Sequence, residues 1–176
     1  MDATRPLRNG SEGNPMIATD KDSIGKAIGR IASGLYIITI RLGERPSAFL
    51  GSWVQQASFE PPILSVAIKA GRQTQELFED GAHFAVNIIP NGDTALMKHF
   101  GRGFGPDQDP YEGMAVIRGV TGVELLPQAV ADLECKIVAS QAVGDHVIYF
   151  GEVIAGRLNP DVKDPAVHIR KSGFHY

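Results

Sequence analysis

The chain has 176 residues, of which 43% are hydrophobic, and a formal net charge of −3. This length suits a single domain with a sizeable core, because chains usually divide into several domains only when they are longer. The weakly acidic balance excludes a broad basic surface, so nucleic acid is not expected as a partner. A single cysteine, Cys135, excludes an internal disulfide and suits a reducing cytoplasm. The sequence has no secretory signal and no apolar run of the roughly 18 residues that a membrane helix needs, so we expect a cytoplasmic protein with no membrane segment.

The N-terminal part predicts an arm followed by a helix. Residues 1–20 are polar and rich in Gly, Pro and Asn, which indicates a flexible arm, part of which could pack on a partner subunit. The remaining residues, 21–176, are expected to form the folded domain. Apolar residues at helical spacing predict a short amphipathic helix over 22–33, capped by Asp22 or Ser23 and ended by Gly34.

A series of β segments follows, interrupted by short helices. We predict strands at 35–42, 47–57, 63–69, 83–90, 129–143 and 145–159, a short β pair within 114–126, and helices at 73–80 and 93–100. Asp93 can cap the second of these helices, and Gly144-Asp145 is a hairpin signal between the two long strands. Long hairpins with few helical crossovers favour a mainly β, antiparallel barrel over a doubly wound sheet. The Gly- and Pro-rich loop at 101–113 is long for a connection, which indicates either a lid or a disordered segment.

The strand at 47–57 is polar where a core strand should be apolar. Ser52, Gln55, Gln56 and Ser58 lie close together, and they would need hydrogen-bond partners if they were buried. Gly51 weakens the strand interior unless something must approach the backbone closely. A ligand with several donors and acceptors could meet both conditions.

Two basic residues and a hydroxyl follow the next strand. Lys69, Arg72 and Thr74 stand at the start of a predicted helix, where side chains and helix N–H groups can bind phosphate. A flat heterocycle along the strand at 47–57, with its phosphate at this turn, would fit flavin mononucleotide (FMN). The plain alternative is an exposed strand end beside ordinary solvated charges, and the residues alone leave both open.

Several aromatic and histidine side chains have a structural and a functional interpretation. Trp53 is either a core or dimer-interface aromatic or a wall beside the ligand ring. His99 either faces the ligand site or lies away from it. His146 is either an ordinary polar residue of the hairpin turn or part of the ligand site. His83 is expected to be structural.

Two further side-chain types are expected to be inert. His168 and His175 have neither metal-ligand spacing nor carboxylate partners, so no metal site is expected. Cys135 alternates with apolar residues in a strand and is expected to be buried and unreactive.

Four segments occur in the order of a known family. They are Gly34–Thr39, Leu50–Ser58, Pro61-Pro62, and Gly144–His146 together with Gly151–Val153. In this order they resemble the flavin reductase family with the FMN-binding split β-barrel fold, over about residues 24–176. The segment "SWVQQASFEPP" and the C-terminal segment "HIRKSGFHY" resemble in particular the flavin reductase-like domain at the C-terminus of cyanobacterial diflavin flavoproteins. Those proteins carry two further domains that do not fit into 176 residues, so we expect a stand-alone relative or an excised domain.

The resemblance implies a homodimer with FMN near the subunit interface. It implies that Leu50, Gly51, Ser52 and Trp53 contact the isoalloxazine, and that Gln56, Ala57 and Ser58 contact the ring or ribityl chain. It further implies that Lys69, Arg72 and Thr74 lie near the phosphate and that His146 lies where the nicotinamide enters. His99, from its position before the Gly-rich loop, is a second candidate on the substrate side. At Leu50-Gly51 and Gln56-Ala57 the sequence differs from many free-standing reductases and matches the diflavin branch more closely. The resemblance therefore does not decide between FMN and FAD as the flavin.

The implied reaction is hydride transfer from NADH or NADPH to flavin N5. The electrons would pass to oxygen, a partner oxygenase or another acceptor, and no side chain is needed as acid, base or nucleophile. The alternatives are an FMN-binding electron-transfer module without its own NAD(P)H activity, and a non-catalytic split-barrel protein that binds flavin or haem.

Overall fold

The structure is a computed structural model that describes residues 17, 19–78, 81–105, 107–161 and 164–175. These residues belong to two compact units, one from residues up to 31 with those from 170 on, and one over 32–169. Most of the predicted arm at 1–20 lies outside the described residues. Within the described ranges, no helix combines the length and apolar character needed to cross a membrane.

The smaller unit contains helix α1 (Lys21–Ile28), which is shorter than predicted. Asp20, not Asp22 or Ser23, caps it by accepting a hydrogen bond from the backbone N–H of Ser23 at 2.9 Å. The helix ends at Gly29, because the C-terminal segment of the chain packs on this turn: the Arg170 N–H donates to the Gly29 carbonyl at 3.0 Å. A Cβ at Gly29 would lie 2.6 Å from the Arg170 carbonyl oxygen, so this contact requires glycine.

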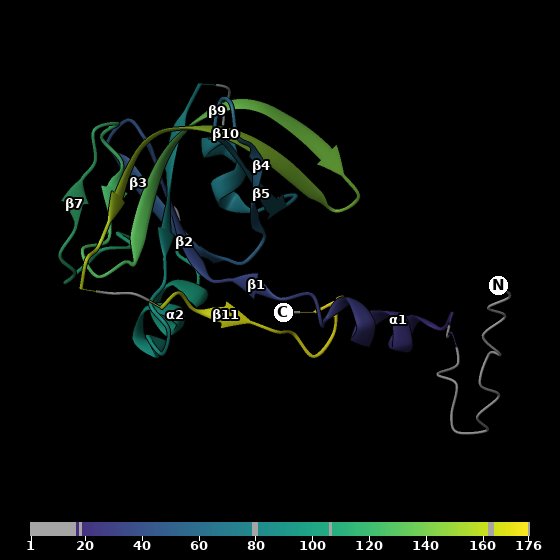
Figure 1. Cartoon of the computed structure of the whole chain (residues 1–176). Helices are drawn as coiled ribbons and strands as arrows, with labels where there is room; N and C mark the ends of the chain where they lie inside the picture. Colours follow the sequence, from purple (N-terminus) through teal and green to yellow (C-terminus); the bar gives the residue numbers. More distant parts are fainter. Residues whose placement is uncertain (1–16, 18, 79–80, 106, 162–163, 176) are drawn as a thin grey trace, which may run out of the picture. The chain divides into compact units, whose positions relative to one another are not determined.

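The larger unit is built on a seven-stranded antiparallel sheet in the order β3-β2-β6-β9-β10-β5-β4 (Figure 1). Its strands are β2 (Tyr36–Leu42), β3 (Arg45–Gly51), β4 (Val54–Ser58), β5 (Ile63–Lys69), β6 (His83–Ile88), β9 (Ala131–Val143) and β10 (His146–Leu158). Two short pairs join β1 (Ser33–Gly34) to β11 (Val167–His168) and β7 (Ile117–Arg118) to β8 (Glu124–Leu125). The mainly β, antiparallel prediction is confirmed, whereas the β1–β11 pair was not predicted.

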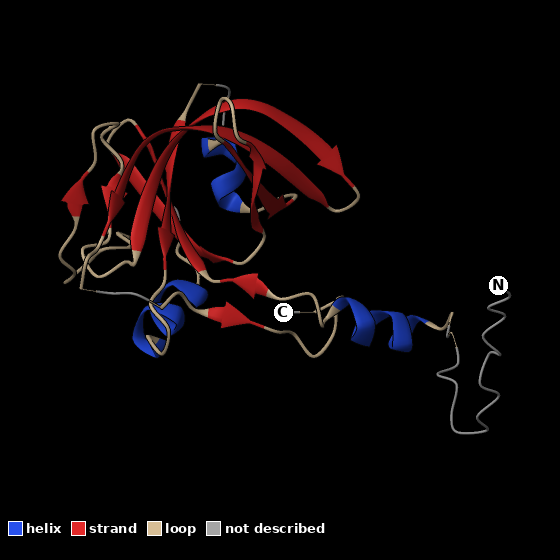
Figure 2. Cartoon of the chain, in the orientation of Figure 1, coloured by secondary structure: helices blue, strands red, loops and turns tan. Residues whose placement is uncertain are grey.

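The predicted strand at 47–57 is wrong as a single element. It breaks at Ser52-Trp53 into β3 and β4, which are the two edge strands of the sheet. Only two residues therefore join opposite edges of a seven-stranded sheet. The sheet must curl until its edges approach each other, and Figure 2 shows the strands curving in this way. This closure turns the sheet into the predicted barrel.

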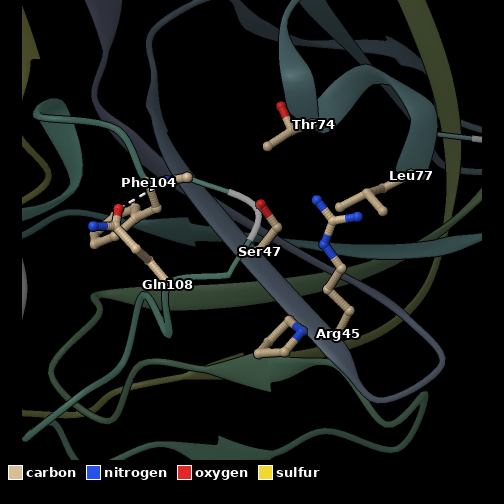
Figure 3. A pocket seen from close by; sticks show the side chains of 8 residues that line it. Arg45, Ser47, Thr74, Leu77, Phe104 and Gln108 are labelled. Carbon is tan, nitrogen blue, oxygen red and sulfur yellow. Dashed lines mark hydrogen bonds between the residues drawn. The ribbon is translucent and has the colours of Figure 1, made fainter.

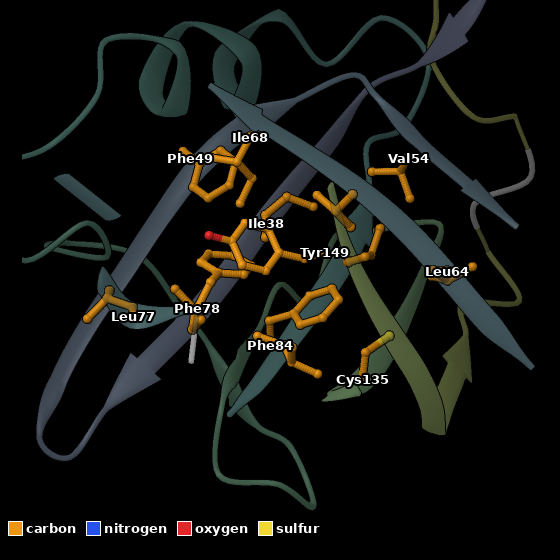
Figure 4. Packing of buried hydrophobic residues seen from close by; sticks show 14 residues of the cluster. Ile38, Phe49, Val54, Leu64, Ile68, Leu77, Phe78, Phe84, Cys135 and Tyr149 are labelled. Atoms are coloured by element: carbon orange, nitrogen blue, oxygen red, sulfur yellow. The ribbon is translucent and has the colours of Figure 1, made fainter. Parts of the chain in front are cut away.

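Two large apolar clusters and a small third one, formed by Ala85, Val123 and Leu125, hold the barrel together. The first lies inside the curled sheet and includes Ile38, Phe84 and Tyr149 (Figure 4). The second contains Ile37 and packs the sheet against helix α2 (Thr94–Gly101) through Leu96 and Phe100. Neighbouring residues of β2 thus contribute to different clusters, so this strand is buried on both faces.

The other predicted elements are present, and some are shorter than expected. The helix predicted over 73–80 is a five-residue 3₁₀ helix, η1 (Gln73–Leu77). Asp93 caps α2 by accepting a hydrogen bond from the Leu96 N–H at 3.0 Å, as predicted. Gly144, with a φ of 59°, and Asp145 form the predicted hairpin turn between β9 and β10.

The loop after α2 is packed, not disordered, in its described part. Tyr111 is 7% exposed and belongs to the second cluster, and its hydroxyl donates to the Ser47 carbonyl at 3.4 Å. Burial raises the pKa of this phenol. The loop is therefore anchored on β3.

Candidate functional site

The break between β3 and β4 leaves an unsatisfied polar side chain inside the protein. The Trp53 carbonyl accepts a hydrogen bond from the Ala67 N–H at 3.0 Å, which ties the junction to β5. Ser52 is only 6% exposed, and its Oγ is buried without a hydrogen-bond partner among the described residues. Because buried hydroxyls normally have partners, this atom marks a position where a ligand or water belongs.

Trp53 and His146 form one wall of the site. Their ring centroids lie 4.7 Å apart with 34° between the ring planes. His146 begins β10, where it stands opposite Lys69 at the end of β5. The register of these two strands thus brings together residues that are 77 positions apart or more in the sequence.

His146 is oriented by its neighbour in the hairpin turn. Its Nδ1 lies 2.7 Å from Asp145 Oδ1, and this hydrogen bond lowers the pKa of the Asp145 carboxyl. Because an ionised carboxylate only accepts hydrogen bonds, Nδ1 is the protonated nitrogen. The other nitrogen, Nε2, is buried and has no hydrogen-bond partner among the described residues.

Arg72 and Thr74 lie at the turn after β5. Arg72 is the N-cap residue of η1, and its Cζ lies 4.5 Å from the centre of the Phe49 ring. Thr74 is 9% exposed. Like Ser52 Oγ and His146 Nε2, its Oγ1 is buried without a hydrogen-bond partner in the described part of the chain. The guanidinium and the hydroxyl therefore stand close together in sequence and space, as a phosphate site requires.

A groove of about 450 Å³ opens beside this turn. It is lined by Ala48, Phe49, Arg72, Thr74, Arg102, Gly103, Phe104, Gly105 and Gln108. A smaller hollow adjoins it and shares Thr74, Phe104, Gly105 and Gln108; in Figure 3, Phe104 and Gln108 lie on one side of this hollow and Arg45 and Leu77 on the other. The groove thus lies between the β3–η1 region and the segment that follows α2.

The predicted contacts at Gln56, Ala57 and Ser58 lie on the edge strand β4. Gln56 and Ala57 are exposed and Ser58 is half-buried. The Gln56 side-chain amide donates to the Ser58 carbonyl at 3.2 Å, across an irregularity in the β4–β5 pairing. These residues are next to the junction but do not line the groove.

Leu50 and Gly51 end β3, and both contact the protein's own core. Leu50 packs against the second apolar cluster. A Cβ added at Gly51 would lie 3.3 Å from Ile38 Cγ1. A side chain at Gly51 would thus press on the core residue Ile38, and the approach of a ligand to this glycine stays a prediction.

The remaining histidines lie elsewhere. His99 Nε2 is 2.8 Å from the Pro110 carbonyl, which fixes the loop after α2, and it does not line the groove. His83 begins β6 and His168 ends β11. In the stretches that the structure describes, no three His, Cys, Asp or Glu side chains are grouped so that they could hold a metal ion.

Most residues that line the groove were not singled out by the sequence, among them Arg102, Phe104 and Gln108. Arg102, Phe104 and Gln108 all belong to the loop that sequence reasoning identified only by its length. The signal available in the sequence was Arg102 and Phe104, a cation and an aromatic residue that are separated only by Gly103 in that loop. Their approach to Thr74 depends on tertiary packing and could not be read from spacing.

Together, a curled antiparallel sheet and a polar, cationic groove beside its closure define a β-barrel domain built to hold a ligand. The chain belongs to the flavin reductase-like domain family, whose sequence profile matches residues 28–175. This membership confirms the resemblance noted in the sequence.

Individual relatives agree with this assignment. The chain is 40% identical over 154 residues to putative diflavin flavoprotein A 3 of Nostoc sp. (strain PCC 7120), covering 87% of this chain and 27% of that protein. It is 41% identical over 152 residues to diflavin flavoprotein A 1 of Synechocystis sp. (strain PCC 6803), covering 86% and 26%. The chain therefore spans about a quarter of the length of these relatives. Among solved structures, the NADH:FAD oxidoreductase of Streptomyces globisporus C-1027 superimposes with a TM-score of 0.75 at 25% identity, over 82% of this chain and 85% of that one.

Proposed function

We propose that this chain is an NAD(P)H:flavin oxidoreductase that passes electrons from bound or diffusing flavin to oxygen or to a partner protein such as an oxygenase. Membership of the flavin reductase-like family supports the class of reaction. The similar Streptomyces globisporus protein is described as an NADH:FAD oxidoreductase and has also been solved in complex with NAD and FAD fragments. We extend this chemistry to the present chain as a proposal.

Three orphaned polar atoms carry the proposal. Of the five buried side-chain nitrogen or oxygen atoms that lack a partner among the described residues, three are Ser52 Oγ, Thr74 Oγ1 and His146 Nε2. Leaving such an atom unsatisfied costs about 1–3 kcal/mol. All three belong to the small set of residues that the sequence assigned to the flavin or the nicotinamide. A flavin, which has polar atoms along its ring edge, ribityl chain and phosphate, fits this set.

A bound flavin would supply the redox chemistry, accepting at N5 a hydride from C4 of NADH or NADPH, which becomes the oxidised nucleotide. The protein's own residues would position the two molecules. Ser52 would hydrogen-bond the ring, while Lys69, Arg72 and Thr74 would bind the phosphate. His146, protonated at Nδ1, offers Nε2 as an acceptor for the carboxamide N–H of the nicotinamide.

An anaerobic titration tests the proposal. The purified protein is loaded with FMN or FAD, and the visible flavin absorbance is followed as NADH or NADPH is added. Bleaching by at least one nucleotide, with one flavin reduced per nucleotide consumed, is expected. If dithionite reduces the bound flavin but neither nucleotide does, the chain is an electron-transfer module and not a reductase.

We also propose that two copies associate through the β9–β10 hairpin. From Val138 to Val143 every residue of β9 is exposed, and in the described part of the chain β9 pairs there with β10 alone. Val138 is 45% and Val143 52% exposed, so two apolar side chains are exposed along this stretch. Such edges favour pairing with another chain. Light scattering after gel filtration should give a dimer for the wild type and for Val120→Lys, a control on an exposed turn, and a monomer for Val138→Lys combined with Val143→Lys.

A further inference from the structure

Trp53 and His146 meet on the outer face of the barrel. His146 stands opposite Lys69 in the β10–β5 pairing, and the next residues, Val147 and Ile68, stand opposite each other. Ile68 belongs to the first apolar cluster and Val147 packs against it, so both point into the barrel. Because side chains alternate along a strand, His146 points outward. Its side chain is nevertheless only 11% exposed, and the indole in contact with it is part of its cover.

The length of the tryptophan side chain makes this contact possible. The Trp53 carbonyl accepts a hydrogen bond from the Ala67 N–H at 3.0 Å, so the Trp53 backbone runs beside β5. His146 lies on β10, the strand on the other side of β5. Neighbouring strands are about 4.8 Å apart, so the indole must span about two strand spacings. A shorter side chain would leave most of the imidazole face uncovered.

Two groups restrain the His146 ring, and they do so differently. The Asp145 carboxylate accepts a hydrogen bond from Nδ1 at 2.7 Å, but the Asp145 side chain is 79% exposed in the hairpin turn. A hydrogen bond to an exposed carboxylate competes with water and contributes little, and it does not fix the tilt of the ring plane. The indole face, with centroids 4.7 Å apart and 34° between the planes, restrains that tilt. Trp53 therefore does most to aim the buried Nε2.

We propose that Trp53 is a positioning residue that acts through His146, holding the imidazole so that Nε2 is aimed at the carboxamide of the nicotinamide. The inference rests on the proposed function, because it requires a nicotinamide nucleotide at His146. It differs from the role that the sequence resemblance implies for Trp53, which is contact with the isoalloxazine. The two roles are separable, since one affects the nucleotide and the other the flavin.

Steady-state kinetics and flavin titrations of Trp53 variants test this role. Trp53→Leu should raise the KM for NADH or NADPH about fivefold, with kcat and the flavin Kd within about twofold of the wild type. Trp53→Phe keeps an aromatic face on a shorter side chain and should lie between the two. In a protein that already carries His146→Ala, Trp53→Leu should not raise the KM further, because the effects of residues that act as a unit are not additive. The matched control is Phe59→Leu, which removes an 87% exposed ring after β4 and should change none of these quantities.

Nitrogen NMR of the flavin-free protein gives a second measurement that does not depend on activity. With isotope-labelled histidine, the ring signals of His146 are those missing from His146→Ala. At about pH 8, where an ordinary imidazole is neutral, the wild type should show a protonated Nδ1 and an unprotonated Nε2. In Trp53→Leu the two signals should move toward each other, because a ring that tilts freely exchanges between tautomers.

The possible failures are distinguishable. If neither nucleotide reduces the flavin of the wild type, the proposed function fails, and the role of Trp53 toward the nicotinamide fails with it, whatever the NMR spectra show. If the wild type is reduced but Trp53→Leu weakens flavin binding as much as it raises the KM, Trp53 is a wall of the flavin site. If its effect on the KM persists beside His146→Ala, Trp53 contacts the nucleotide itself. Unchanged His146 signals in Trp53→Leu would show that the ring is held without Trp53, and a monomeric Trp53→Leu beside a dimeric wild type would assign Trp53 to a subunit contact. Each of these results overturns the proposal.

Discussion

The indole of Trp53 and the imidazole of His146 lie with their centroids 4.7 Å apart, although Trp53 comes from the break between two edge strands and His146 from the first residue of β10. The His146 ring is held by the Asp145 carboxylate on one side and by Trp53 on its face. Its second nitrogen is buried and unsatisfied by the described residues. We therefore expect this nitrogen to act on a molecule that enters the site.

Replacing His146 by Ala should impair the reaction with the nicotinamide substrate more than the binding of flavin. The expected result is a drop in kcat/KM for NAD(P)H of about tenfold, equivalent to the loss of one hydrogen bond, with the flavin Kd changed less than about twofold. Steady-state kinetics and fluorescence titration measure the two quantities. His175→Ala, at an exposed position, should change neither. An equal loss in both quantities for His146→Ala would contradict a separate role toward the nucleotide.

Replacing Thr74 by Val should separate binding from stability. The substitution removes a buried hydroxyl that has no partner among the described residues, so the flavin-free protein should unfold at the same or a higher urea concentration. Affinity for phosphorylated flavins should fall by about 1–2 kcal/mol, while riboflavin binding should be unaffected.

Thr39→Val is the matched control for this change. Thr39 is fully buried, but its Oγ1 donates to the Glu124 carbonyl at 2.6 Å and accepts from the Asn87 amide at 3.2 Å. Its loss should destabilise the protein by about 1–3 kcal/mol without a selective effect on flavin phosphate binding. If Thr74→Val destabilises as much as Thr39→Val, the Thr74 hydroxyl has a structural partner and not a ligand.

Gly151→Ala should be strongly destabilising. A Cβ at this position would lie 2.6 Å from two ring carbons of Phe84, which is fully buried. Overpacking of this kind costs about 1–3 kcal/mol or more, measured as a lower urea midpoint. Gly101→Ala, in the last turn of α2, meets only an ordinary contact of 3.5 Å and should be neutral or slightly stabilising. A tolerated Gly151→Ala would show that Phe84 can move.

The stability of the protein should fall at alkaline pH through Cys135. Burial raises the pKa of this thiol from 9.0 to about 12 in the folded protein. The stabilisation is therefore complete below pH 9 and is lost as the pH rises toward about 12, because the unfolded chain ionises first. Urea unfolding across this range should show a weaker pH dependence for Cys135→Ala than for the wild type. A folded wild type that reacts rapidly with a thiol reagent would contradict this burial.

The sequence predicted the barrel class because hydrophobic alternation, glycine turns and one hairpin signal are local features. It also singled out Ser52, Thr74 and His146 as candidates: Ser52 from a polar cluster within a strand, Thr74 from its position after two basic residues, and His146 from the family resemblance. It did not predict the strand break at Ser52-Trp53. The β propensity is continuous across 47–57, so nothing in it indicates that the chain passes there from one edge of the sheet to the other. Arg102 and Phe104 were missed for a related reason: their proximity to Thr74 is created by the anchoring of the loop through Tyr111.

The two-residue connection between β3 and β4 has a consequence for folding. Strands that are adjacent in sequence occupy opposite edges of the sheet, so the barrel is complete only when the five intervening strands have also paired. Contacts of this non-local kind form slowly, because loop-closure entropy is lost before the contacts compensate for it. Ser52 and Trp53 would then acquire their final positions in the last step. We expect recovery of flavin binding during refolding to lag behind recovery of β-sheet circular dichroism, so that the ligand reports when the barrel has closed.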